Sequence, residues 1–322
     1  MPTYHGISSE AFRHPLDKQA EQTLRSVPGF DILARAFVEH LYERPQKIYH
    51  LGNSIQAGTK QYSTIYGILR ECARDLDVSP QPDLYVSQNS QVNSYALGHE
   101  HPYIVVNTGL LDLLTEVELR TVLAHELGHI KCNHTILIQM AIWATGAASM
   151  LGEITFGLGN LISTGLIYAF YEWRRKAELS ADRAALLVMD ELTPIMQTMM
   201  KLAGGSSRYG NECSLEEFIR QSEQYRELDD KSLNQIYKFL LYNGGNGAFL
   251  SHPFPVERVH YLKQWSTSSE YSQIRQGNYT RAGAQGSVEV ESKAPNQTTE
   301  AEALRQQIAE LQAEIERIKR NQ

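Results

Sequence analysis

The feature that most constrains this chain is a long segment, residues 135–171, whose only charged side chain is Glu153. Apolar residues fill two halves of about 18 residues each, which is the lower limit for a helix that crosses a membrane. We predict an apolar helical hairpin that is kept from water. The short halves, the tight joint at Glu153 and the polar residues Gln139 and Asn160 favour a buried or interfacial hairpin over a spanning one, which remains the alternative.

Charge and cysteine content narrow the class of protein. The net charge is −7 over 322 residues without a basic patch, so no nucleic-acid partner is expected. Three scattered cysteines are too few for a disulfide framework or a cysteine zinc site, which indicates a reducing compartment. The first residues carry no secretory signal, so we expect a cytoplasmic protein. Basic residues at 131 and 174–176 would hold both ends of a membrane-associated hairpin on the cytoplasmic face.

Residue periodicity predicts several helices and one small sheet. Apolar residues recur at helical spacing in five segments, whereas three short segments rich in Val, Ile and Tyr lie between turn residues and predict strands. The helical segments are 15–50 (interrupted at Pro28-Gly29), 62–76, a run from 110 into 125–129, 174–203 and 214–243, and the strands are 83–88, 92–98 and 102–107.

Composition divides the chain into three regions. Residues 1–265 have the apolar content of a folded domain, which includes the 135–171 hairpin. Residues 266–298 are rich in Ser, Gly, Gln, Thr and Asn and poor in apolar residues, which predicts a disordered linker. Residues 299–322 predict a short coiled-coil helix.

The pattern of this last helix is a coiled-coil seam. Its apolar residues alternate spacings of four and three, and oppositely charged residues flank them, which favours a parallel homodimer. Only about three heptads are present, so a solvated amphipathic tail remains the alternative. The seam residues are Leu304, Ile308, Leu311, Ile315 and Ile318.

The sequence His125-Glu126-Leu127-Gly128-His129 lies in a helical run without proline. On a helix, residues i and i+4 share a face, so both imidazoles can bind one ion while Glu126 holds a water beside it. This is the HExxH pattern of zinc peptidases, in which one coordination position stays open for water. Gly128 costs about 1 kcal/mol relative to alanine inside a helix, which indicates that another part of the chain approaches it closely.

A second helical segment offers the remaining ligand. Glu178 and Asp182 are also four residues apart and share a face. Glu178 can supply an oxygen ligand, which gives a His2Glu site for one Zn²⁺ per chain. Asp182 can accept a hydrogen bond from the far nitrogen of a ligand histidine. Without HELGH, the two acids would be interpreted as solvated charges or as partners of Arg174 and Arg183.

The other histidines are not expected to bind the metal. His134 follows His129 by five residues, which turns it off the ligand face of a helix. His99 and His101 are interpreted in the same way. Cys132 is expected to be a small buried residue rather than a ligand.

HELGH followed by Glu178-Leu-Ser-Ala-Asp182 resembles the HtpX-like and CAAX prenyl protease-like family of zinc metallopeptidases, of the gluzincin type. The resemblance implies a mainly helical α+β metalloprotease domain. No N-terminal membrane spans like those of the membrane-embedded members precede the motif in this sequence, so we expect a protein more similar to the compact bacterial members. Further stretches that resemble the family are PLD (15–17), NSYALG (93–98), IVVNTGLLDLL (104–114) and SHPFPVER (251–258), so that the resemblance spans about residues 10–265.

The resemblance also implies roles outside the metal site. His252 matches a late active-site segment and is the candidate for stabilising the oxyanion, with a turn-capping role before Pro253 as the alternative. Arg258 is a weaker candidate. An extended substrate peptide is expected to add to the strand with the Asn-x-x-Ala pattern, which consists of Asn93, Ser94, Tyr95 and Ala96.

These inferences predict a zinc-dependent metalloendopeptidase that hydrolyses proteins or peptides, with Glu126 as general base, in protein quality control. The alternative is a zinc-containing scaffold protein that binds client proteins and is joined by its coiled coil. The intact Glu126 speaks against a scaffold, because a binding protein has no need of a general base.

Overall fold

The computed structural model describes residues 2–27, 29–30, 44–99, 101–142, 158–229 and 254–282. Residues Met1–Ala282 form one unit, and Gly283–Gln322 form a second. The predicted coiled-coil helix of residues 299–322 falls in the second unit and lies outside the described residues.

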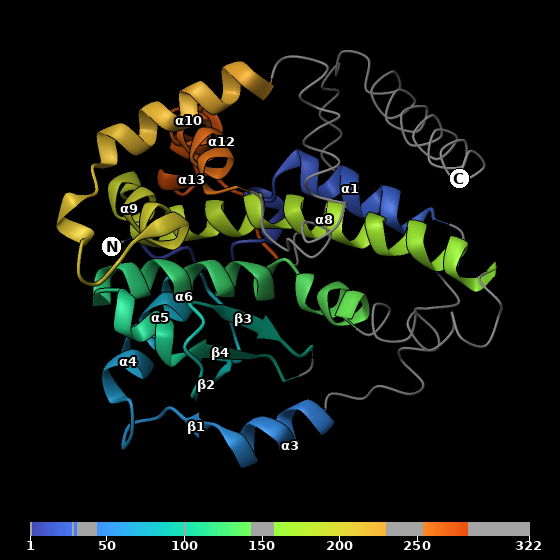
Figure 1. The fold of residues 1–322 in the computed structure, drawn as a ribbon, viewed down its shortest axis with the longest axis horizontal. Helices are drawn as coiled ribbons and strands as arrows, with labels where there is room; N and C mark the ends of the chain where they lie inside the picture. Colours follow the sequence, from blue (N-terminus) through green and yellow to red (C-terminus); the bar gives the residue numbers. More distant parts are fainter. Residues whose placement is uncertain are drawn as a thin grey trace. The chain divides into compact units, whose positions relative to one another are not determined.

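Two helices that run in opposite directions form the centre of the first unit. They are α6 (Glu116–Lys131) and α8 (Leu158–Met189), which lie side by side, with α6 between α8 and the sheet (Figure 1). Three further helices pack on α8, namely α1 (Pro15–Arg25), α9 (Leu192–Gly204) and α12 (Pro255–Ser266). The other helices are η1 (Ser9–Ala11), α3 (Arg44–Asn53), α4 (Ser63–Asp75), α5 (Thr108–Leu113), η2 (Gly210–Glu212), α10 (Leu215–Asp229) and α13 (Ser269–Arg275).

The three predicted strands are confirmed as β2 (Asp83–Ser87), β3 (Ser94–Leu97) and β4 (Tyr103–Asn107). The sheet has the order β1-β2-β4-β3, and β2 and β4 are parallel whereas β1 and β3 are antiparallel to their neighbours. The fourth strand, β1 (Ile55–Gln56), was not predicted because two exposed residues carry no alternating pattern. The fold is therefore mainly helical with a small sheet, as expected.

The sheet separates two hydrophobic clusters because successive side chains of a strand point to opposite faces. Leu84 and Ile104 belong to the cluster that α4, α6 and α9 complete. Tyr85, Tyr103 and Val105 belong to the other cluster, to which α1 and α8 contribute. This second cluster also contains the described flanks of the apolar segment 135–171.

Those flanks are folded into the protein. Residues 134–142 are helical, and Leu137 and Ile138 are buried against the same cluster as Phe170 and Trp173 of α8. For these residues the structure agrees with the buried hairpin, although Ile142 is exposed. Residues 143–157, which include the expected turn, lie outside the described residues.

A membrane-spanning segment is not found in the described structure. None of its helices combines the length and the apolar content that crossing a membrane requires. The helix α8 is long, but it begins at Leu158 rather than at about residue 174 as predicted, so that the second half of the apolar segment and Glu178 share one helix.

The helix that carries HELGH begins later than predicted. The chain forms the short helix α5, leaves the helical conformation at Leu114, and starts α6 at Glu116. Thr115 and Glu118 form a capping box, in which each side chain hydrogen-bonds the backbone N–H of the other. The sequence Thr-x-x-Glu is the pattern of a helix start, but the apolar periodicity that continues from residue 110 predicted one uninterrupted helix.

The first part of the predicted linker is folded, so the predicted domain boundary at residue 265 is wrong. Residues 269–275 form α13, whose Tyr271 and Ile274 are buried beside Trp265 of α12. Arg281 pairs with Ile7 in a β-bridge near the N-terminus. A few apolar residues suffice to pack this segment on the domain. The average composition of the segment therefore did not predict that it folds. Residues 283–298 lie outside the described residues.

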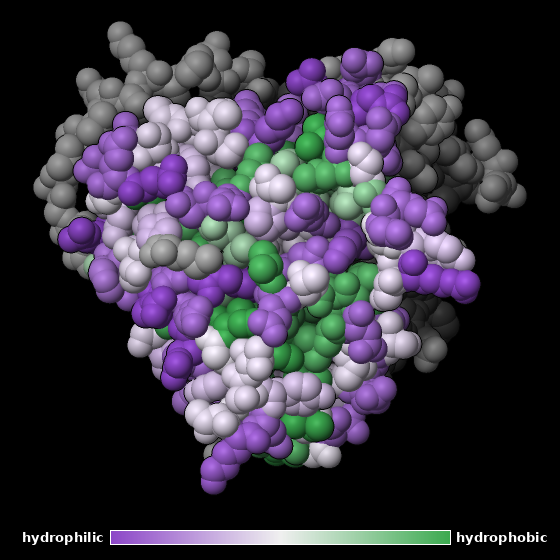
Figure 2. Space-filling view, turned by 90° about the vertical axis from the view of Figure 1, so that its left-hand side faces the viewer, coloured by the Kyte–Doolittle hydropathy of each residue, from purple (hydrophilic) through white to green (hydrophobic). Residues whose placement is uncertain are grey.

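The surface near the start of α6 and the end of α9 mixes apolar and polar groups. Figure 2 shows this side of the molecule, on which hydrophobic residues lie between hydrophilic ones. Val117 of α6 and Leu202 of α9 are among the large exposed hydrophobic residues. Apolar exposure of this scattered kind is ordinary for folded domains and does not by itself indicate a binding surface.

The contact between α6 and α8 is closest at Gly128. A Cβ atom added there would lie 2.7 Å from Cβ of Ala184 and 2.9 Å from Cα of Ala181. The prediction that another part of the chain approaches Gly128 is confirmed. Small residues on both helices allow the two backbones to approach each other. The neighbouring side chains of α6 and α8 can therefore contact one another.

We expect Gly128→Ala to destabilise the metal-free protein by about 1–3 kcal/mol, because the new methyl group overpacks the contact with α8. Gly67→Ala is the matched control, since a Cβ at this helical position of α4 meets nothing within 4 Å. The control should raise stability by about 0.5–1 kcal/mol through helix propensity. Urea unfolding in the presence of a chelator measures both changes, and an equal gain in both variants would contradict the close approach.

Candidate metal centre

The helix α6 presents His125 and His129 on one face, as predicted. Their Nε2 atoms lie 3.2 Å apart. The side chains retain only 12% and 5% of their exposure, so the two imidazoles point into the protein rather than to solvent.

Glu178 approaches the same two nitrogens from α8. Its Oε2 lies 3.2 Å from Nε2 of His125, and its Oε1 lies 3.4 Å from Nε2 of His129. Ligands bound to zinc at about 2.0–2.1 Å in a tetrahedron lie about 3.3–3.4 Å from one another. Among the described residues, these three side chains form the group that could hold a metal ion. The two imidazole nitrogens thus lie at about this spacing from each other, and each lies at about this spacing from one carboxylate oxygen of Glu178.

The centre favours positive charge. Burial opposes protonation of His125, but hydrogen bonds to Asp182 and Glu178 outweigh it and raise the pKa of this imidazole to about 9. The carboxylates therefore create a position where a positive charge is stable. A metal cation bound there would replace that proton.

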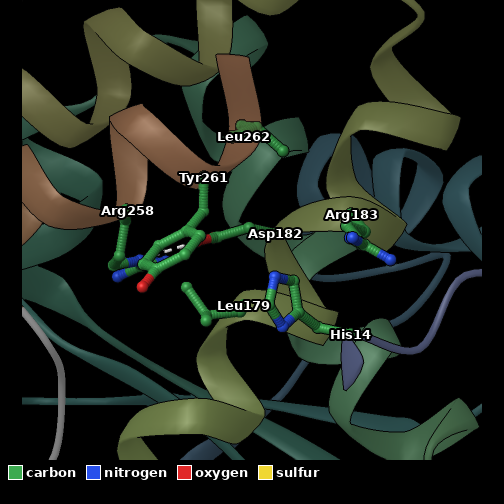
Figure 3. A pocket seen from close by; sticks show the side chains of 7 residues that line it. All are labelled: His14, Leu179, Asp182, Arg183, Arg258, Tyr261 and Leu262. Carbon is green, nitrogen blue, oxygen red and sulfur yellow. Dashed lines mark hydrogen bonds and ion pairs between the residues drawn. The ribbon is translucent and has the colours of Figure 1, made fainter. Parts of the chain in front are cut away.

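Asp182 contacts His125, one of the two histidines that could bind a metal, as predicted. Its Oδ1 lies 3.0 Å from Nδ1 of His125, which leaves Nε2 of that ring directed at His129 and Glu178. Arg258 of α12 donates to both oxygens of Asp182, from Nε at 2.8 Å and from Nη2 at 2.5 Å (Figure 3). Burial raises the pKa of Asp182, but Arg258 outweighs it and holds this pKa below its usual range. Arg258 therefore keeps Asp182 ionised and orients it.

His134 is not in the group that could hold a metal ion, in keeping with its interpretation from sequence, but its ring contacts His129. Its Nδ1 lies 3.0 Å from Nδ1 of His129, on the side of the ring opposite to the ligand atoms. The helix α6 ends at Lys131, and Asn133 has a φ of 57° that turns the chain back before residues 134–142 continue as helix. Helical geometry from His129 to His134 does not apply because the helix ends between them. The only signal for this helix end in the sequence was Asn133, because asparagine is common shortly after the last residue of a helix.

Glu126 lies beside strand β3. The hydroxyl group of Ser94 donates a hydrogen bond to Oε1 of Glu126 over 2.6 Å. Ser94 was predicted to bind substrate, and the structure shows that its side chain orients the carboxylate. A hydrogen bond between a strand and a helix that are 32 residues apart in sequence could not be read from spacing.

The other residues of this strand lie where an alternating strand places them. The backbone oxygen of Asn93 accepts a hydrogen bond from the Asn107 N–H, and Ala96 is buried. The hydroxyl group of Tyr95 lies 3.5 Å from Nε2 of His50, on the other face of the sheet. Cys132 is buried, as expected. His252 lies outside the described residues.

The comparisons with known proteins identify the family. The pattern of Peptidase family M48 matches residues 60–266. Plastoglobule-localized metallopeptidase 48 of Arabidopsis thaliana is 36% identical over 275 residues, which cover 84% of this chain and 76% of the plant protein. The protease HtpX homolog of Methylibium petroleiphilum is 26% identical over 65% of this chain and 77% of its own length. That of Thermoanaerobacter pseudethanolicus is 30% identical over 69% and 79%.

The chain therefore belongs to Peptidase family M48, among the HtpX-like metallopeptidases, as the resemblance implied. Members of this family depend on a metal and act on proteins or peptides, and the group His125, His129 and Glu178 is the place where this chain could bind one.

We expect Arg258→Met to destabilise the metal-free protein by about 3–5 kcal/mol, because it removes the guanidinium that donates two hydrogen bonds to the buried Asp182. The double variant Arg258→Met/Asp182→Asn should recover most of this loss, since neither charge then remains buried alone. Chelator-treated samples unfolded in urea measure both variants. If the double variant lost the sum of the single losses, the two residues would not be coupled.

Proposed function

We propose that the protein is a zinc-dependent metalloendopeptidase, with His125, His129 and Glu178 as ligands of one Zn²⁺ per chain. The observation that carries this proposal is the convergence of three side chains from two packed helices: the two Nε2 atoms lie 3.2 Å apart, and each lies 3.2–3.4 Å from one carboxylate oxygen of Glu178. Two imidazole nitrogens and one carboxylate oxygen are the ligand set of a catalytic zinc site that keeps one position for water.

Zinc at this position would lower the pKa of a bound water and polarise the carbonyl group of the scissile peptide bond. Glu126 is the general base, which accepts a proton from the attacking water and donates it to the leaving amine. Ser94 holds Oε1 of this carboxylate, so that Oε2 is the oxygen for proton transfer. His252 is proposed to stabilise the oxyanion, on the basis of the family resemblance of its Ser-His-Pro segment.

The substrate peptide is proposed to bind along β3. Within the described residues, β3 is an edge strand that pairs with β4 alone. An extended peptide can satisfy its backbone hydrogen bonds at such an edge. Residues Asn93–Ala96 would bind the peptide through their backbone, and the hydrogen bond from Ser94 places Glu126 beside the same strand. The peptide would thereby pass the general base.

The proposed cellular role, location and oligomeric state rest on the sequence-based predictions alone. We propose a part in protein quality control at the cytoplasmic face of a membrane, where the contact would use the apolar segment 135–171 between its buried flanks. A homodimer would form through residues 299–322. These features are independent of the proposed chemistry, so they can fail without affecting it.

We expect Glu126→Gln to retain one Zn²⁺ per chain and to lose casein or peptide cleavage by a factor of 10² or more, because it removes only the base. Glu116→Gln is the matched control, since it changes an exposed glutamate on the same helix and should leave cleavage unchanged. Metal analysis of the purified full chain and initial cleavage rates are the measurements. Chelation should abolish cleavage by the wild type, and added Zn²⁺ should restore it.

The same experiment separates the peptidase from the scaffold alternative. Client binding that is unchanged in Glu126→Gln, together with no cleavage by the zinc-loaded wild type, would favour the scaffold. A wild type that binds no zinc would contradict the proposed metal site itself.

A further inference from the structure

The carboxylate of Asp17 lies at the centre of a buried hydrogen-bond network that the sequence did not predict. Its side chain is fully buried in α1. His134 and Ser180 approach its Oδ2 at 3.0 and 2.7 Å, and Trp173 donates to its Oδ1 over 3.2 Å. Arg13 supplies the opposite charge, with Nε 2.7 Å from Oδ2 and Nη2 3.0 Å from Oδ1. Donors from the segment before α1, from α8 and from the segment after α6 thus converge on one carboxylate.

This network connects directly to the proposed metal ligand His129. A neutral imidazole that binds metal through Nε2 carries its proton on Nδ1. This N–H must donate to Nδ1 of His134, which lies 3.0 Å away. His134 then accepts at Nδ1 and carries its own proton on Nε2, which donates to Asp17 over 3.0 Å. With His134 neutral, one arrangement of protons satisfies every group from His129 to Asp17.

The two ligand histidines are therefore supported in parallel ways. His125 is hydrogen-bonded to Asp182, which Arg258 holds by two hydrogen bonds. His129 is hydrogen-bonded to His134, and this ring reaches Asp17, which Arg13 holds by two hydrogen bonds. In both cases the chain ends at a buried carboxylate bound to an arginine, but the second contains an additional imidazole.

A purely structural role does not account for all of these contacts. An ion pair with Arg13 would suffice to bury Asp17, as the pairing of Asp75 with Arg120 illustrates in α4. The orientation of His134 has no such explanation, because its ring lies in a direct line between a metal-ligand nitrogen and a carboxylate. Groups that hydrogen-bond the far nitrogen of a ligand histidine fix its ring and increase its basicity.

We propose that His134 and Asp17 are positioning residues of the metal centre, which fix the ring and tautomer of His129. Asp17 belongs to the stretch PLD (15–17), which precedes the matched residues 60–266, so the N-terminal helix α1 completes the site. The inference rests on the proposed function, because it requires His129 to bind metal through Nε2.

The experiment compares Asp17→Asn with Asp75→Asn in the full-length chain. Asp75 is an equally buried carboxylate that is paired with Arg120, and within the described residues its hydrogen-bond partners include no member of the proposed metal site. Competition with a zinc chelator should show a 10- to 100-fold loss of affinity for Asp17→Asn and little change for Asp75→Asn. Both variants should lose thermal stability when metal-free. Equal zinc affinities of the two variants would overturn the proposal.

A pair of substitutions at His134 keeps the test decisive if Asp17→Asn fails to fold. His134→Gln retains an oxygen that can accept from Nδ1 of His129, whereas His134→Phe retains ring size and removes the acceptor. We expect His134→Gln to remain close to wild type in zinc affinity and His134→Phe to lose 10- to 100-fold. The visible absorption spectrum of the Co²⁺-substituted protein should change in His134→Phe only. Identical spectra and affinities would overturn the proposal.

The failure of the inference differs from the failure of the proposed function. If the wild type binds neither Zn²⁺ nor Co²⁺ with one ion per chain, the metal site itself is wrong. If the wild type binds both and none of the variants at Asp17 and His134 alters affinity or spectrum, only the positioning role is wrong.

Discussion

The close contact between α6 and α8 is the constraint on which the rest of the structure depends. Gly128 faces Ala181 and Ala184, and no side chain separates the two backbones there. The residues on either side of this contact are the two histidines on one helix and Glu178 on the other. A bulkier residue in place of Gly128 would move the helices apart and change the 3.2–3.4 Å separations among the donor atoms. The glycine therefore belongs to the site although it binds nothing.

Buried charge is the second organising principle. Carboxylates in an apolar interior are stable only when cations and hydrogen-bond donors surround them. Asp182 and Asp17 meet this requirement through Arg258 and Arg13, which come from opposite ends of the described chain. The segments before and after the central helices are thereby tied to the same centre, since each provides a charge that the centre needs.

Much of this arrangement could be predicted because it follows from short-range spacing. The i,i+4 pairs on α6 and α8 identified Asp182 and the three residues that could hold a metal ion, and alternating Val, Ile and Tyr residues identified three of the four strands within the described residues. The break before Thr115 had a sequence signal that apolar periodicity obscured. The folding of residues 266–282 was missed because docking there depends on a few buried aromatic and aliphatic side chains rather than on composition.

The contacts that could not be predicted from the sequence are those between segments far apart in the chain. The hydrogen bond from Ser94 to Glu126 joins a strand to a helix, and the one from His134 to Asp17 joins residues 117 positions apart. Neither has a spacing that would reveal it, because tertiary packing alone decides which side chains meet. His134 was even set aside by a correct rule of helix geometry applied beyond the end of the helix.

Because α8 is one continuous helix, a tilt about its contact with Gly128 displaces its distant apolar end much more than it displaces Glu178. Its contact with Gly128 lies at Ala181, and Glu178 is only about 5 Å along the axis from that point, at 1.5 Å per residue. The apolar end at Leu158 is about 35 Å from it in the same direction. A tilt about this contact that shifts Glu178 by half an ångström would carry the apolar end several ångström. A metal ion bound by Glu178 would therefore limit the tilt of the whole helix, together with Phe170 and Trp173, which are buried between these two points.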